Sequence, residues 1–65
     1  MNAFDLIKNN DFVVMAMADA FELLSDKTGI SITALQEQFP TNKELQTRVA
    51  EMITTAAKIT AKELG

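Results

Sequence analysis

A chain of 65 residues that contains neither cysteine nor histidine must be held together by packing, within the chain or against another chain. Disulfides and thiolate zinc sites need cysteine, whereas imidazole metal sites and the commonest acid–base catalyst need histidine. A domain of this size buries only about 60% of the surface that its unfolded chain exposes. The length therefore predicts a single helical domain over residues 1–65 and favours its self-association into a homodimer.

The composition predicts an all-α fold. Apolar residues make up 48% of the chain, which is enough for a packed core and too many for a disordered protein. Alanine and methionine are frequent among them, and both lose little free energy on entering a helix. Only two glycines and one proline are present, so there is little turn chemistry for a sheet.

Cap and break signals divide the first half of the chain into two expected helices. Asn2 can cap a short helix over residues 3–8, and Asn10 or Asp11 can cap a second helix over residues 12–27. The glycine that follows can end the second helix in the left-handed conformation. Because this segment is apolar on nearly all sides, we expect it to be the buried central helix.

The second half of the chain predicts a short third helix and a long last one. Ser31 can cap a helix over residues 32–39, which the following proline ends. Residues 41–44 read TNKE, a capping box that can start a helix running to about Leu64. Its heptad-like apolar stripe is assigned to the helix's own core, with a coiled coil as the alternative: Leu45, Val49, Met52, Ala56 and Ile59. The expected fold is a compact bundle of three to four helices.

No pattern in the sequence points to catalysis, a cofactor or a metal. The nine acidic side chains are not accompanied by histidine, cysteine or a glycine-rich loop. Asp19, Glu22 and Asp26 share one helical face, which could in principle bind a hard cation. A solvated acidic stripe is the simpler interpretation. We therefore predict a protein that is not an enzyme and that has no cofactor.

The acidic stripe also contains two large apolar residues, and together they form the first candidate surface for binding another protein. Helical geometry places Phe12 and Met15 on either side of Asp19, with Glu22 on the same face. Either the first helix covers Phe12 and Met15, which is the simpler interpretation, or they are exposed and mark a contact site. A rim of acids around Phe and Met is typical of a protein-binding patch.

The outer face of the last helix is the second candidate surface, with Arg48, Glu51 and Thr55 on it. Together the two surfaces predict a protein-interaction module, such as a small regulator, adaptor or inhibitor that acts by binding another protein. The sequence does not identify that protein. A structural subunit of a larger assembly is an alternative.

One stretch resembles a helix-turn-helix motif. Residues 23–35 read LLSDKTGISITAL, in which Gly29 takes the turn and Leu24 and Leu35 stand where the two helices would pack. The resemblance implies two helices that cross at a steep angle. It also implies the main alternative function, that of a dimeric DNA-binding regulator, ahead of a structural subunit.

Under that alternative the expected DNA contacts are Thr33, Gln36 and Lys43. Glutamine and threonine can read base edges. The net charge of −3 and the absence of lysine and arginine from 28 to 42 remove the phosphate-anchoring contacts on which affinity depends. Nucleic acid is therefore not the partner that we expect.

The apolar run over residues 12–18 is neither a membrane span nor a secretion signal. It is far shorter than a bilayer-spanning helix. Asp5 and Asp11 precede it with only Lys8, whereas the segment before a signal core is positively charged. The sequence therefore predicts a cytoplasmic protein without contact to a membrane.

Overall fold

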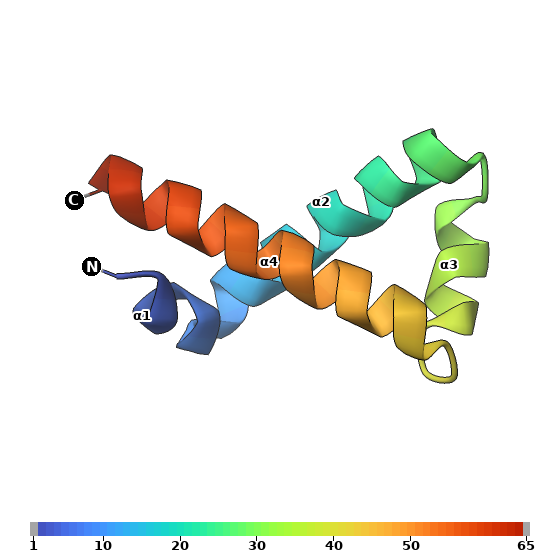
Figure 1. Ribbon diagram of the computed structural model, residues 1–65, viewed down its shortest axis with the longest axis horizontal. Coiled ribbons are helices and arrows are strands. Elements are labelled where there is room, and N and C mark those ends of the chain that lie inside the picture. Colours follow the sequence, from blue (N-terminus) through green and yellow to red (C-terminus); the bar gives the residue numbers. More distant parts are fainter. Residues whose placement is uncertain (1, 65) are drawn as a thin grey trace.

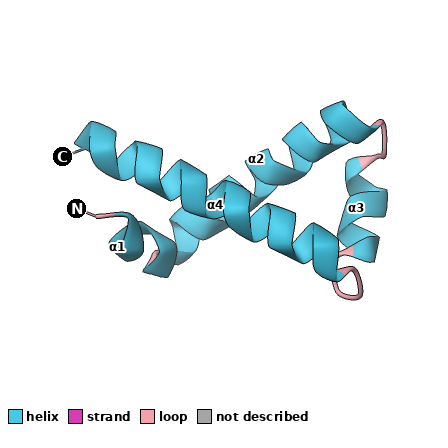
Figure 2. Cartoon of the chain, in the orientation of Figure 1, coloured by secondary structure: helices cyan, strands magenta, loops and turns pink. Residues whose placement is uncertain are grey.

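The computed structural model describes residues 2–64, and within this range the chain forms helices and no strand (Figures 1 and 2). The four helices are α1 (Ala3–Lys8), α2 (Asn10–Thr28), α3 (Ile32–Gln38) and α4 (Lys43–Leu64). Short connections join them, as Figure 2 shows. The predicted all-α bundle, with two long and two short helices, is confirmed.

The two long helices cross, and the two short ones lie at opposite ends of the molecule. In Figure 1, α4 passes in front of α2, and the two helices pack against each other. The helix α1 lies where α2 begins and α4 ends, and it packs against both of them. The helix α3 lies at the other end and packs against α2. Since α2 contacts all three other helices, it is central, as the sequence predicts. The expectation that it is a buried helix is wrong, because only four of its 19 residues are buried.

Three of the predicted helix ends are confirmed by their hydrogen bonds. The side chains of Asn2 and Ser31 accept backbone N–H bonds three residues ahead, at 2.9 and 3.2 Å. Gly29 has a φ of 75° and follows α2 in the left-handed conformation. A side chain at this position would be strained, because only glycine adopts that conformation at no steric cost.

The predicted start of α2 is wrong by two residues. The cap is Asn9, whose side chain accepts from the backbone N–H of Phe12 at 3.2 Å, and not Asn10 or Asp11. Asn9 also ends α1, because its own N–H donates to the carbonyl of Leu6. One extended residue therefore separates the helices, and the next two can enter the first turn of α2.

The predicted cap of α4 is also displaced by one residue. Asn42 accepts from the backbone N–H of Leu45 at 3.1 Å, which makes Asn42 the cap. The hydroxyl of Thr41 instead donates to the carbonyl of Gln38, at the end of α3. Glu44 thus stands at the second helical position, from which it cannot complete a capping box.

The core lies where α2 and α4 cross and extends to α3. Its buried members come from these three helices: Ala16, Ala20, Phe21 and Leu24 of α2, Leu35 of α3, and Leu45, Val49 and Ile53 of α4. The rings of Phe21 and Phe39 meet edge to face, with centroids 5.7 Å apart, and this contact fastens the end of α3 to α2.

The buried face of α4 differs from the predicted stripe. Its buried residues repeat every four positions: Leu45, Val49, Ile53 and Ala57. Met52 and Ala56 pack against the edge of the core, whereas Ile59 is 55% exposed. The assignment of the whole stripe to the core is therefore wrong at Ile59. Because an α-helix has 3.6 residues per turn, buried residues that repeat every four positions shift gradually around α4. The buried side of α4 therefore faces α2 in its first half and α1 near its C-terminal end.

One side of α2 is buried and the other side faces outward. Val14 and Met15 are 66% and 69% exposed, and Leu23 is 45% exposed. A helix with three neighbours, two of them short, cannot bury apolar residues around its whole circumference. The surplus of apolar residues on α2 therefore remains on the surface.

Candidate functional site

The residues of the first predicted surface, on the outer face of α2, differ in exposure. Met15 is well exposed beside the exposed acids Asp19 and Glu22, so α1 does not cover it. Phe12 is half-buried and packs against the core. The expectation that the first helix covers Met15 is thus wrong. Phe12 belongs to the packing around the core more than to the surface. Besides Met15, Val14 is the other large exposed apolar side chain of this part of α2, and two such side chains beside acids make too small a patch to hold a partner.

A larger apolar surface lies between α2 and α4, and we call it the α2–α4 groove. It is an open hollow of about 380 Å³, lined by six residues: Leu23, Glu51, Met52, Thr55, Ala56 and Ile59. Two of the residues predicted for the second surface, Glu51 and Thr55, belong to this groove. Leu23 and Ile59 are absent from the surfaces predicted from the sequence, because both lie on apolar stripes whose pattern predicts burial in the core.

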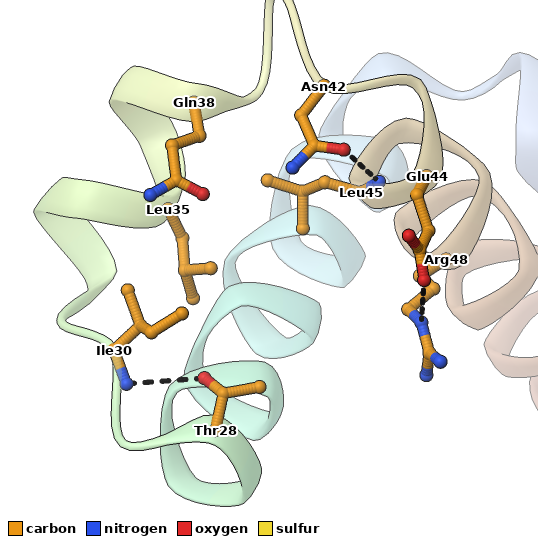
Figure 3. Close-up of a pocket in the computed structure, with 8 residues that line it drawn as sticks. All are labelled: Thr28, Ile30, Leu35, Gln38, Asn42, Glu44, Leu45 and Arg48. Carbon is orange, nitrogen blue, oxygen red and sulfur yellow. Dashed lines mark hydrogen bonds and ion pairs between the residues drawn. The ribbon is translucent and has the colours of Figure 1, made fainter.

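The third residue of the second predicted surface, Arg48, lines a separate hollow of about 240 Å³ at the other end of the molecule. Figure 3 shows Ile30 and Leu35 on one side of this hollow and Glu44 and Arg48 on the other side. The Arg48 and Glu44 side chains pair at 3.9 Å, and both are largely exposed. An exposed pair of this kind contributes little stability and leaves the hollow without net charge for binding an anion.

The outermost side of α4 carries small and hydroxyl side chains. The hydroxyls of Thr47 and Thr54 donate to carbonyls of their own helix, at Lys43 and Ala50, over 3.0 and 2.9 Å. These hydroxyls are therefore engaged and are not free donors for a ligand. Glu51 and Lys58, which are exposed on this side, are the groups left for charged contacts.

The residues predicted to contact DNA are exposed, but their surroundings carry no excess positive charge. Thr33 and Gln36 lie on the outer side of α3, and Lys43 lies in the first turn of α4. The cations of this part of the chain are matched by as many acids: Lys27, Lys43 and Arg48 against Asp26, Glu37 and Glu44. The helix-turn-helix resemblance thus agrees with the order of α2, turn and α3, and DNA binding stays an untested alternative.

The described residues offer neither a cluster for a metal ion nor a helix that could span a membrane. Within residues 2–64, the acidic side chains do not gather in any group of three that could hold a metal ion. In the same range, no helix combines the length and the apolar composition needed to cross a bilayer. The acids of α2 are therefore described as an exposed stripe.

The described residues form a small four-helix fold with an open, largely apolar groove between its two long helices. Comparisons with protein-family models, with curated proteins and with solved structures find no significant match to the chain.

Proposed function

We propose that this protein is a protein-interaction module, a small regulator, adaptor or inhibitor that binds another polypeptide through the α2–α4 groove. The observation that carries the proposal is the exposure of several apolar side chains side by side in one concave surface. Leu23 and Ile59 are 45% and 55% exposed, and Met52 and Ala56 form the floor between them.

Single exposed apolar residues are ordinary on a protein surface, whereas a contiguous set points to a contact site. The groove also has the arrangement of an interface, because its apolar floor is bordered by the polar residues Glu51 and Thr55. Methionine on its floor can adjust to the shape of a partner side chain. A shallow groove between two helices suits an amphipathic helix better than a small molecule.

Site-specific photocrosslinking in cells that make the chain tests this proposal. A photoreactive residue in place of Thr55, on the rim of the groove, is expected to form adducts with protein. The same residue in place of Met15 reports on the α2 face, and in place of Thr33 it serves as the control on α3. All three positions are exposed, so the replacement leaves the core intact.

Adducts with protein from Thr55 that are absent from Thr33 support the proposal. Their mass tells a different protein from a second copy of 7.2 kDa. Equal adducts from all three positions, or no protein adduct from Thr55, contradict the proposal. Adducts with nucleic acid from Thr33 would favour the DNA-binding alternative.

A further inference from the structure

We propose that the α2–α4 groove binds a second copy of this chain, and that two α4 helices pack antiparallel to each other across it. This inference rests on the proposed function, since it names the occupant of the same groove. Three observations carry it: the excess surface of the single chain, the apolar seam on α4, and the charges beside that seam.

The single chain exposes more surface than a compact protein of its mass. Its accessible surface is 4776 Å², whereas a folded monomer of 7.2 kDa exposes about 4,100 Å². The radius of gyration is 12.3 Å, against about 11 Å for a compact chain of this length. The excess surface is of the same order as the ~800 Å² that each partner buries in a standard interface.

The seam runs along the flank of α4 that borders the groove. Met52 and Ile59 recur there seven residues apart, with the polar Thr55 of the groove rim between them, and the spacings of three and four residues match a heptad repeat. Leu23 of α2 adds an apolar side chain beside them. In Figure 1 the C-terminal halves of α2 and α4 diverge from their crossing, and the residues that line the groove leave it open to solvent.

Charges next to the seam select one antiparallel register. With Met52 opposite Thr55 of the second copy, Glu51 lies beside Lys58 of the second copy. The two-fold symmetry forms this pair twice. A shift by one layer in one direction places Lys58 beside Lys58 of the second copy. A shift in the other direction opposes Glu51 to Glu51 of the second copy. Like charges at such positions disfavour both shifted registers. In the favoured register Ile59 faces Arg48 of the second copy at each end of the contact, where the aliphatic part of the arginine can cover it.

Sedimentation equilibrium from micromolar to millimolar concentration tests the inference on the full chain. We expect a reversible dimer of twice 7.2 kDa. Thr55→Arg places an unpaired charge in the seam, and it is expected to weaken dimerisation by at least about tenfold. Thr47→Arg is the matched control, because Thr47 is exposed on the same helix outside the groove. The control is expected to leave the dimer unchanged.

A charge swap tests the register without altering the seam. Glu51→Lys and Lys58→Glu each oppose like charges twice, and each is expected to weaken the dimer by about fivefold. The double swap restores the opposite pairs and should restore most of the affinity. Both residues are exposed, so their substitution leaves the core intact, and helical circular dichroism verifies the fold of each variant.

A wild-type chain that stays monomeric at all concentrations overturns the inference. A dimer that tolerates Thr55→Arg, or a double swap that fails to restore affinity, overturns the proposed interface or its register. If the chain is monomeric and Thr55 crosslinks to a different protein, only the inference fails. If it is monomeric and no protein adduct forms, the proposed function fails as well.

Discussion

The two long helices, α2 and α4, differ widely in sequence and yet bury the same number of residues. The helix α2 is apolar on nearly all sides, whereas α4 carries polar side chains on most of its surface. Four residues of each helix are buried: Ala16, Ala20, Phe21 and Leu24 in α2, and Leu45, Val49, Ile53 and Ala57 in α4. The amount of burial is thus set by the neighbours that a helix has, and apolar residues beyond that number stay on the surface.

This comparison also shows what each helix contributes. The helix α4 buries the apolar residues of one face, and Val49 and Ala57 are 1% and 0% exposed, whereas Ile59 stays on the surface. On α2, by contrast, Val14, Met15 and Leu23 remain outside the core. The surplus on α2 supplies Leu23 to the groove. The surface available for binding therefore comes from residues that the small core could not accommodate.

The largest expected effect is the difference in stability between two valine-to-aspartate variants, one on each long helix. Val49→Asp places a charge in the centre of the core and is expected to cost at least about 4 kcal/mol, enough to unfold a domain of this size. Val14→Asp, at a position that is 66% exposed, should change the free energy of unfolding by less than about 1 kcal/mol. Urea unfolding followed by circular dichroism measures both. Similar losses in the two variants would contradict the difference in burial.

An intermediate effect is expected at the start of α4. Asn42→Ala removes the side-chain oxygen that accepts the N–H of Leu45, and it should cost about 1 kcal/mol. Thr41→Ala is the matched control, and its effect is expected to be within about 0.5 kcal/mol because Thr41 does not cap the helix. Thermal unfolding of the two variants compares them. A larger loss in the Thr41 variant would show that the predicted capping box forms in solution.

The smallest effect is expected at Met15. Met15→Asp adds a carboxylate four residues from both Asp11 and Asp19, and like charges at this spacing cost a few tenths of a kcal/mol. The helical circular-dichroism signal should stay unchanged, because Met15 is 69% exposed. Loss of that signal would show that another part of the molecule covers Met15. Added salt should reduce the small difference from the wild type, since it screens exposed charges.

The sequence by itself determined the class of fold and the approximate position of every helix. These features are local: Asn2, Ser31 and Gly29 each act through hydrogen bonds or backbone angles within a few residues. The predicted caps are wrong where neighbouring residues can compete for the same role. This is the case at Asn9 to Asp11 and at Thr41 and Asn42. Adjacent residues of the same capping type have nearly equal preferences, and the course of the chain between helices decides among them.

Only the tertiary structure decided which apolar residues are buried. Helical periodicity places Leu23 and Ile59 on apolar stripes, but it does not say how far a neighbouring helix extends along each stripe. The two long helices diverge from their crossing (Figure 1), and α1 and α3 close only the two ends. Leu23 and Ile59 therefore line an open groove, while Val49 in the same stripe is buried at the centre. The candidate site is a consequence of this geometry, because burial depends on contacts between residues that are distant in sequence.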